Sequence, residues 1–309
     1  MAERPLDAIA VEPRHSRAWL DEAVIAGGGT VVDLASASGL VWTHADDPGG
    51  LADVLAQHPH LAWVQLPWAG IEPYVHVVRA HADRTWTCGK GVYAEPVAEH
   101  ALAMALAGRR HLVGYARAGA WTGQAGVNLL GARVVILGGG GITESLLRLL
   151  GPFGCEVVVV RRQAQPMVGA TTVVGMEELD AVLPGADVVV LALALTPETA
   201  GIIDRRRLEL LGPECWLVNV ARGGHVVTDD LVAVLHEGRL GGAALDVTDP
   251  EPLPPEHPLW DEPYCLITPH TANTVEMAFP LLTERVRENV RRRIAGEALL
   301  GPVDPEAGY

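Results

Sequence analysis

The segment Val134–Thr143, with the sequence VVILGGGGIT, decides how the middle of the chain folds. Its aliphatic run predicts a buried strand, its glycines predict a tight turn, and the residues from Ile142 onward predict a helix. In the glycine-rich turn G-x-G-x-x-G, this order places a helix N-terminus against the phosphates of a dinucleotide. Gly138 and Gly140 occupy the first two glycine positions, and Thr143 stands at the third, which mainly concerns helix–strand packing. We therefore predict a dinucleotide site that includes Gly138, Gly140, Gly141 and Ile142.

The segments around this turn alternate between strand-like and helix-like patterns. Most strand-like runs are nearly continuous in Val, Leu, Ile and Ala, as expected for parallel strands that helices cover on both faces. The predicted strands are 133–137, 156–160, 171–174, 187–193, 216–220, 242–247 and 265–268, and the predicted helices are 142–150, 177–183, 204–211 and 229–237. The alternation predicts an α/β fold with a Rossmann-type doubly wound parallel sheet.

The first part of the chain predicts a second, smaller α/β domain. Its strand candidates are 7–11, 31–34, 40–43, 62–65 and 85–88, and its helix candidates are 16–26 and 51–57. A long helix at 95–110 leads into the middle of the chain, and another at 275–294 follows the last strand. We expect that last helix to pack on the N-terminal domain. Residues 1–94 with 274–309 would then form one discontinuous domain, and 95–273 the dinucleotide-binding domain.

Composition excludes several classes of function. The chain has 309 residues, 49% of them hydrophobic, and a net charge of -15, so it has no general attraction for nucleic acids or anionic membranes. Its start is charged and lacks a long apolar run, so no signal peptide is expected. The four cysteines form no CxxC pair and predict reduced thiols in a cytoplasmic protein. His58 and His60 lack the spacing of a metal site, and we predict no metal.

The end of the second predicted strand of the larger domain bears on the choice of cofactor. In the dinucleotide fold, an acidic residue about 20 positions after the glycine turn binds the ribose of NAD. This chain has Arg161 and Arg162 instead, and guanidinium groups suit a 2′-phosphate. The pair favours NADP(H) over NAD(H), unless the two arginines are merely solvated.

Three ionisable residues follow later strands of the same predicted sheet. They are Arg222 in WLVNVARGGHVV, Glu251 in GAALDVTDPEPLP and His270 in LITPHTANT. In a doubly wound sheet the ligand crevice lies at the carboxyl ends of the strands, so these side chains are expected there together. An arginine, a carboxylate and a histidine can together bind an anion and transfer a proton.

At these residues the chain resembles the D-isomer-specific 2-hydroxyacid dehydrogenases, most of all the glyoxylate/hydroxypyruvate reductases. The matching segments are LAWVQLPWAG, GVYAEPVAEH, the glycine turn, LTPETAGIID, NVARGG, LDVTDPEPLP and TPH, which together span nearly the whole chain. The resemblance implies an enzyme that reduces a small 2-keto acid to the D-2-hydroxy acid with hydride from NAD(P)H. It also implies a smaller, flavodoxin-like substrate domain.

The resemblance further implies a role for each matching residue. Arg222 would bind the substrate carboxylate and polarise the keto oxygen, and His270 would protonate that oxygen. Glu251 would orient the imidazole ring and stabilise its charged form. Asp246 would contact the nicotinamide carboxamide, and Ala221 would lie beside the cofactor. In the smaller domain, the backbone N–H groups of Ala69 and Gly70 would help to bind the substrate carboxylate, with Trp68 as a pocket wall.

The sequence leaves alternatives for the function and for the helix at 93–110. A nucleotide-sensing interaction protein of the same fold, similar to the C-terminal-binding-protein corepressors, is one alternative, and a dehydrogenase for a bulkier keto acid is another. Glu251 disfavours formate dehydrogenase, which has glutamine there. The helix at 93–110 resembles the one that pairs subunits in this family, so we expect a homodimer, although its apolar run could equally be core within one chain.

Overall fold

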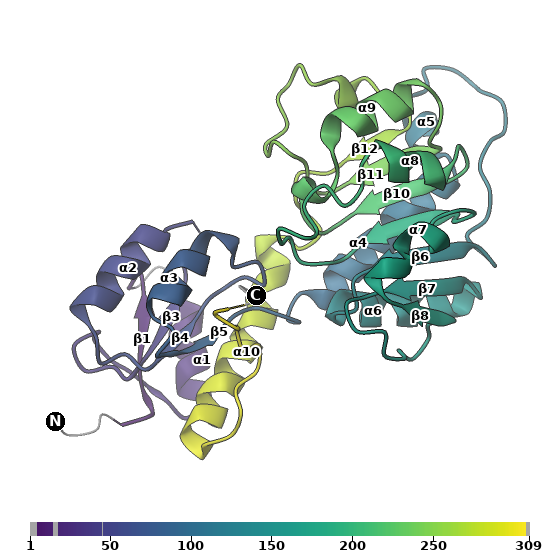
Figure 1. Ribbon diagram of the computed structural model, residues 1–309. Coiled ribbons are helices and arrows are strands. Elements are labelled where there is room, and N and C mark those ends of the chain that lie inside the picture. Colours follow the sequence, from purple (N-terminus) through teal and green to yellow (C-terminus); the bar gives the residue numbers. More distant parts are fainter. Residues whose placement is uncertain (1–4, 15–17, 45, 307–309) are drawn as a thin grey trace. The chain divides into compact units, whose positions relative to one another are not determined.

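The computed structural model describes residues 5–14, 18–44 and 46–306, and the chain folds as two compact units (Figure 1). One unit is formed by Met1–Tyr93 with Val275–Tyr309, and the other by Ala94–Thr274. Each is a parallel sheet with helices on both faces, so the predicted α/β class is confirmed. Within the described residues, no helix is long and apolar enough to cross a membrane.

The larger unit contains a seven-stranded parallel sheet. Its strands are β6 (Arg133–Leu137), β7 (Glu156–Val160), β8 (Thr172–Val174), β9 (Val188–Leu191), β10 (Trp216–Asn219), β11 (Gly242–Leu245) and β12 (Cys265–Ile267). They follow the order β12-β11-β10-β9-β6-β7-β8, so the direction of winding reverses between β6 and β9. This is the Rossmann arrangement, in which ligands bind outside the carboxyl ends of the strands at the reversal.

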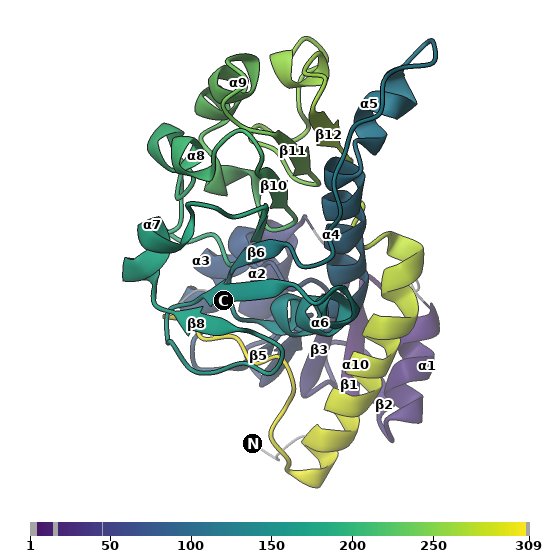
Figure 2. The same cartoon turned by 90° about the vertical axis from the view of Figure 1, so that its right-hand side faces the viewer.

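Helices cover both faces of this sheet (Figure 2). On one face lie α4 (Ala94–Arg109) and α6 (Gly141–Leu150), which pack against each other. On the other lie α7 (Leu179–Val182), α8 (Arg205–Leu211) and α9 (Thr228–His236). The remaining helices of the unit are short: α5 (Leu112–Arg117), η2 (Gly151–Phe153), η3 (Met176–Glu178), η4 (Gly223–His225) and η5 (Pro258–Trp260). Strands β6 and β9 are thereby buried on both faces, which explains their continuous aliphatic sequences.

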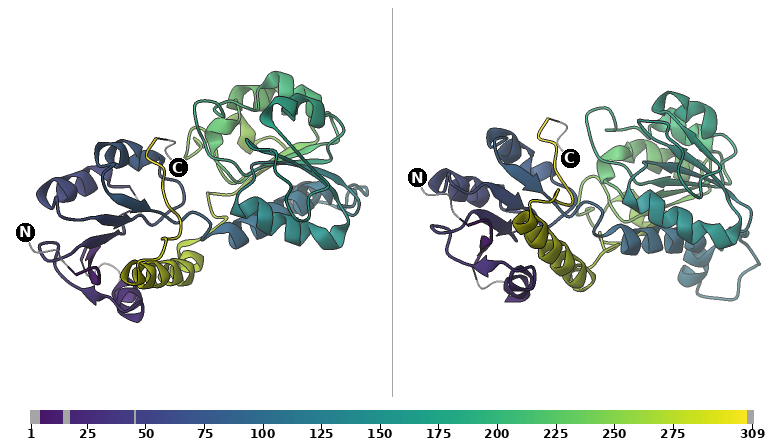
Figure 3. Two further views of the ribbon diagram at one scale, coloured as in Figure 1. Left: turned by 60° about the horizontal axis from the view of Figure 1, so that its bottom comes forward. Right: turned by 90° about the horizontal axis from the view of Figure 1, so that it is seen from below.

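The smaller unit has a five-stranded parallel sheet in the flavodoxin-like order β2-β1-β3-β4-β5. Its strands are β1 (Ala8–Glu12), β2 (Thr30–Val31), β3 (Gly39–Trp42), β4 (Trp63–Gln65) and β5 (Thr85–Thr87). Figure 3 shows α1 (Ala18–Ala26) and α10 (Val275–Ala295) together on one face. The other face carries α2 (Pro48–Gln57), η1 (Glu72–Tyr74) and α3 (Val75–Ala80). Leu20 and Val24 of α1 share a buried cluster with Val286 and Val290 of α10, so the end of the chain completes the core of its beginning.

Three buried polar side chains tie the sheet of the smaller unit to α10. The Thr87 hydroxyl donates to Gln65 Oε1 at 2.8 Å, and Asn289 Nδ2 donates to the same oxygen at 2.8 Å. Asn289 also exchanges hydrogen bonds with the backbone of Leu300. None of the three side chains is exposed, so these hydrogen bonds satisfy polar groups that water cannot reach.

The predicted elements differ from the observed ones mainly at their ends. Strand β2 is shorter than the predicted 31–34 because the chain turns at Asp33, whose carbonyl accepts from the Ser36 N–H. The helix predicted at 16–26 begins at Ala18 among the described residues, and its first two positions lie outside them. Helices α3 and α5 were not predicted, because each is only 6 residues long and has little periodicity.

Candidate active site

The glycine turn after β6 requires glycine at its first position. Gly138 has φ +115°, and a Cβ there would lie 2.1 Å from the Ala192 carbonyl oxygen. Its N–H donates to the Val160 carbonyl at 2.8 Å, so the turn begins against both β7 and the end of β9. A larger residue would clash with backbone that cannot move aside, and glycine is therefore the residue that fits.

The turn then opens onto the N-terminus of α6. Gly140 is the N-cap, and among the described residues no side chain caps this helix. A Cβ at Gly140 would meet nothing within 4 Å, so its backbone lies open to an approaching ligand. Gly141 and Ile142, both half-buried, begin the helix. The first N–H groups of α6 and its helix dipole can thus bind a phosphate, and these residues fit a dinucleotide.

The two predicted arginines follow β7, beside the glycine turn. An added Cβ at Gly139 would lie 2.7 Å from Arg161 Nε, so the half-buried Arg161 side chain runs alongside the turn. Arg162 is exposed. At least one guanidinium therefore stands next to the backbone that would bind the phosphates, where an additional phosphate could reach it.

The loop after β10 is held by Asn219. Its side-chain amide donates to the Arg222 carbonyl at 2.9 Å, and its Oδ1 accepts from the Ala221 N–H at 3.0 Å. The ring of the fully buried His225 lies against the backbone of Arg222, with Nδ1 2.9 Å from the carbonyl oxygen. Arg222 is half-buried, and its Nη1 donates to the Ala221 carbonyl at 2.7 Å. Both backbone polar groups of Ala221 are thus already used within the loop.

This loop lies directly against the loop after β11. A Cβ at Gly223 would stand 2.0 Å from the Thr248 carbonyl oxygen, and Asp249 is almost as close. Glycine after Arg222 is therefore required because it lets two backbones touch. The contact joins the arginine loop to the segment that leads into Glu251.

Glu251 and His270 face each other across the ends of β11 and β12. The distance from His270 Nδ1 to Glu251 Oε1 is 2.7 Å, and the two side chains are 49% and 41% exposed. A carboxylate at Nδ1 accepts the proton of that nitrogen and leaves Nε2 as the nitrogen available to a substrate. The structure therefore brings together the histidine and the glutamate expected from the sequence.

His270 has the left-handed φ of +51°, which is uncommon for a residue with a side chain. Asp246, 2% exposed, holds this loop. Its Oδ1 accepts from the Thr268 hydroxyl at 2.6 Å and from the Thr271 N–H at 2.8 Å. Its Oδ2 accepts from the Ala272 N–H at 3.0 Å, and its backbone carbonyl accepts from the His270 N–H at 2.8 Å. One residue therefore fixes the backbone on both sides of His270 and offsets the cost of its conformation.

His100, on α4, completes this group. Its Nε2 lies 3.1 Å from the Thr268 hydroxyl oxygen and 3.5 Å from Asp246 Oδ1. Since that hydroxyl donates its proton to Asp246, His100 Nε2 must be the donor toward Thr268. Burial raises the pKa of Asp246, but the hydrogen bonds from His100, Thr268, Thr271 and Ala272 outweigh burial and lower it below its ordinary value. The carboxylate is therefore charged when it holds the loop.

In the smaller unit, the loop after β4 contains Trp68, Ala69 and Gly70. The Gly89 N–H donates to the Trp68 carbonyl at 2.9 Å, and the Tyr93 hydroxyl donates to the Pro67 carbonyl at 2.7 Å. The Trp68 ring, half-buried, lies 5.4 Å from that of Tyr93 between centroids. These contacts fix the loop while Ala69 stays exposed.

Sequence reasoning missed the residues that position the site. His100, Thr268, Asn219 and His225 carry no motif of their own, and their partners are set by the fold. The glycines of NVARGG were a usable signal for Gly223, because a glycine next to a charged residue marks a close backbone approach. Over residues 5–14, 18–44 and 46–306, no group of three or more His, Cys, Asp or Glu side chains is placed to hold a metal ion.

Comparison with known proteins shows the family to which the chain is similar. Residues 101–272 match the family model of the D-isomer specific 2-hydroxyacid dehydrogenase NAD binding domain. An uncharacterized protein in the proB 3′ region of Corynebacterium melassecola is 38% identical over 297 residues, which cover 93% of this chain and 95% of that protein.

Two solved structures extend the comparison. A D-isomer specific 2-hydroxyacid dehydrogenase from Xanthobacter autotrophicus, in complex with NADPH and MES, is 28% identical with a TM-score of 0.83 and covers 98% of this chain and 99% of its own. An NADPH-dependent glyoxylate/hydroxypyruvate reductase from Sinorhizobium meliloti, in complex with NADP and sulfate, is 27% identical with a TM-score of 0.80. The match covers 98% of this chain and 100% of the reductase.

Proposed function

The chain belongs to the D-isomer-specific 2-hydroxyacid dehydrogenases, a family of NAD(P)-dependent oxidoreductases, and on this premise we propose that it reduces a small 2-keto acid of the glyoxylate or hydroxypyruvate type to the D-2-hydroxy acid. The observation that carries the proposal is the 2.7 Å contact between His270 and Glu251 at the carboxyl edge of the sheet. Arg222 follows the neighbouring strand, and its loop adjoins the one that leads to Glu251.

The proposed roles follow from these contacts. Glu251 accepts the Nδ1 proton of His270 and fixes the ring, so that Nε2 holds the proton that passes to the keto oxygen. The Arg222 guanidinium binds the substrate carboxylate and stabilises the negative charge that develops on that oxygen. A bound nicotinamide supplies the hydride that reduces the keto carbon. Asp246 keeps His270 in place through the loop backbone, which adds a positioning role to its expected contact with the carboxamide.

We assign the glycine turn, Ala221 and Asp246 of the larger unit to the cofactor, and Trp68, Ala69 and Gly70 of the smaller unit to the substrate carboxylate. The position of Arg161 beside the turn supports NADP(H) as the preferred cofactor. The NADPH and NADP bound to the Xanthobacter and Sinorhizobium proteins support the same preference. The four cysteines are free, which fits the cytoplasmic location that we propose.

We also propose a homodimer, in which the segment after α4 contributes apolar surface. The apolar run of α4 is core within its own unit: Ala98, Ala101 and Met104 are at most 1% exposed. The exposed apolar side chains come after α4, where Leu112 is 52% exposed and Trp121 fully exposed.

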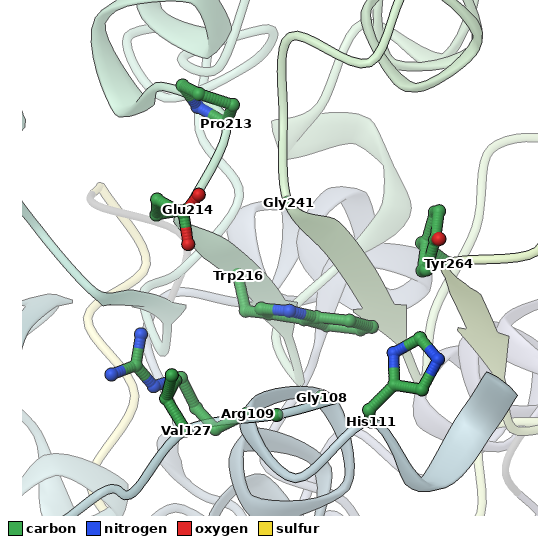
Figure 4. A pocket seen from close by; sticks show the side chains of 10 residues that line it. Gly108, Arg109, His111, Val127, Pro213, Glu214, Trp216, Gly241 and Tyr264 are labelled. Atoms are coloured by element: carbon green, nitrogen blue, oxygen red, sulfur yellow. The ribbon is translucent and has the colours of Figure 1, made fainter. Parts of the chain in front are cut away.

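A cavity next to these residues adds to the proposed dimer surface. It has a volume of about 150 Å³ and lies at the amino ends of β10–β12, lined by Trp216, His111 and Tyr264 among others (Figure 4). A second copy of the chain would cover the exposed Leu112 and Trp121 side chains. Light scattering should report a dimer for the wild type and a smaller mass for Trp121→Ser. A monomeric wild type would contradict the proposal.

The activity is tested by offering glyoxylate, hydroxypyruvate, pyruvate and phenylpyruvate with NADPH and, separately, with NADH. We expect turnover with glyoxylate and hydroxypyruvate. In the reverse direction, we expect oxidation of D-glycerate but not of L-glycerate. Loss of a general acid costs about 10²–10⁴ in rate, so His270→Ala should lower kcat by about a thousandfold. The matched control is His236→Ala, because that histidine is a surface residue with an 85% exposed side chain.

The same assay separates the remaining alternatives. Arg161→Ala should raise KM for NADPH about tenfold and leave KM for NADH unchanged, since a charge-assisted pair contributes about 1.5 kcal/mol or more. A preference for phenylpyruvate would indicate the bulkier-substrate dehydrogenase. NADPH binding without turnover of any of the four acids would reject the reductase and favour the nucleotide-sensing protein.

A further inference from the structure

We propose that Thr143 is a positioning residue for the cofactor: its hydroxyl holds the glycine turn in the conformation that binds the dinucleotide pyrophosphate. This inference rests on the proposed dinucleotide site and deepens it. The threonine stands where the usual motif has glycine, at the position that mainly concerns helix–strand packing. The structure gives it a use that glycine cannot supply.

The contact is a single buried hydrogen bond. Thr143 is the third residue of α6 and is not exposed at all, and its Oγ1 donates to the Gly138 carbonyl at 2.8 Å. A buried hydroxyl without a partner is costly, so this bond is strongly favoured once the side chain is inside. Gly138 is thereby held at both polar groups, because its N–H donates to Val160 on β7.

The acceptor lies outside the helix. A threonine within a helix ordinarily bonds its hydroxyl to the carbonyl three or four residues earlier, which here would be Gly140 or Gly139. The hydroxyl of Thr143 instead reaches Gly138, five residues earlier, where the chain has left β6 and has φ +115°. The bond therefore joins α6 to the turn and does not merely add to the helix.

The bond also sets the direction of a backbone donor. In a trans peptide the C=O and N–H point to opposite sides of the plane. With the Gly138 oxygen turned toward Thr143, the N–H of Gly139 in the same peptide points away from the buried side chain. Gly139 lies between the strand and the open N-cap at Gly140. The proposal therefore assigns this N–H to the phosphate.

Four consecutive glycines make this restraint important. Residues 138–141 are all glycine, and glycine loses more backbone freedom on ordering than any other residue. A turn of this kind must be ordered when the ligand binds, unless it is already held in the folded protein. The Thr143 hydroxyl holds it in advance, so the proposal predicts tighter binding of any ligand that contains the pyrophosphate.

The test compares Thr143→Val, which keeps the shape and loses the hydroxyl, with Thr143→Ser, which keeps the hydroxyl. We expect Thr143→Val to raise the Kd of NADPH about tenfold, measured by nucleotide fluorescence, and Thr143→Ser to stay within about twofold of the wild type. Adenosine 2′-phosphate lacks the pyrophosphate, so its inhibition constant against NADPH should be equal in all three proteins. If Thr143→Val does not fold, the pair Thr143→Ser and Thr143→Ala gives the same contrast.

The outcomes distinguish the two levels of proposal. Equal Kd values for NADPH in Thr143→Val and the wild type would overturn the role of Thr143 and leave the proposed enzyme intact. Equal losses for NADPH and adenosine 2′-phosphate would overturn it too, because they would indicate a general distortion of the site. A wild type that binds neither NADPH nor NADH would overturn the proposed function itself.

Discussion

The loops after β10 and β12 carry Arg222 and His270, and each is held by one buried polar side chain at a strand end. Asn219 holds the first loop with a neutral amide, and both of its bonds go to residues within three positions. Asp246 holds the second loop with a carboxylate, and its partners lie on the neighbouring strand and beyond.

The two loops depend on tertiary structure to different degrees. The amide of Asn219 both donates and accepts, as the adjacent carbonyl and N–H require, so its bonds stay within its own strand and loop. The carboxylate of Asp246 only accepts and is met only by donors, including the Thr268 hydroxyl that is in turn bonded to His100 on α4. The His270 loop is therefore held by contacts that join β11, the segment after β12, and α4.

Replacement of Asp246 should have the largest effect. In Asp246→Asn, the amide nitrogen would face an N–H or hydroxyl donor, and breaking a buried charged network costs about 2–4 kcal/mol. We expect a free energy of unfolding lower by about that amount and a kcat lower by about a hundredfold, because His270 loses its fixed position. Urea denaturation measures the free energy of unfolding, and the rate of NADPH oxidation measures kcat. A stable variant with normal kcat would show that the loop does not depend on this carboxylate.

Asn219→Ala should have a smaller effect. It removes two local hydrogen bonds, which contribute about 1 kcal/mol each, and the Gly223 contact and His225 still hold the loop. The expected change is about 2 kcal/mol in stability, with a rise in KM for the keto acid as Arg222 becomes less ordered. If this variant were as impaired in kcat as Asp246→Asn, the contrast between the two loops would be wrong.

His100→Gln tests the outer end of the Asp246 group. Glutamine keeps a donor but cannot place it with the rigidity of a ring, so about 1 kcal/mol of stability and about a fivefold lower kcat are expected. The effect should largely disappear in the Asp246→Asn background, because residues of one network are not additive. If the two substitutions lowered stability and kcat additively in the double mutant, His100 would not belong to the Asp246 network.

The pH dependence of stability should show the smallest effect. The folded state lowers the pKa of Asp246, so its contribution is complete above the unfolded value of about 3.9 and is lost as pH falls through the folded value. The stability difference between wild type and Asp246→Asn should therefore be constant above about pH 5 and shrink below pH 4. A difference that grew on acidification would mean that the sign of the shift is wrong.

Sequence reasoning went furthest where a residue's environment is dictated by its near neighbours. The continuous aliphatic strands β6 and β7 were predicted to the residue, and the glycines before α6 marked the turn. The family resemblance, now confirmed, indicated His270 and Glu251, and the structure brings them into contact. The chemical roles of these residues stay predictions.

The order of the strands and of most helices, the glycine turn and the family follow from the sequence, because periodic burial and glycine conformation act over a few residues. The role of Asp246 in holding the His270 loop, and the place of His100 behind it, follow only from the tertiary structure. His100 and Thr268 are 168 positions apart in the chain. A hydrogen bond needs its two atoms within about 3 Å, and no local pattern can state which distant residues packing will bring that close.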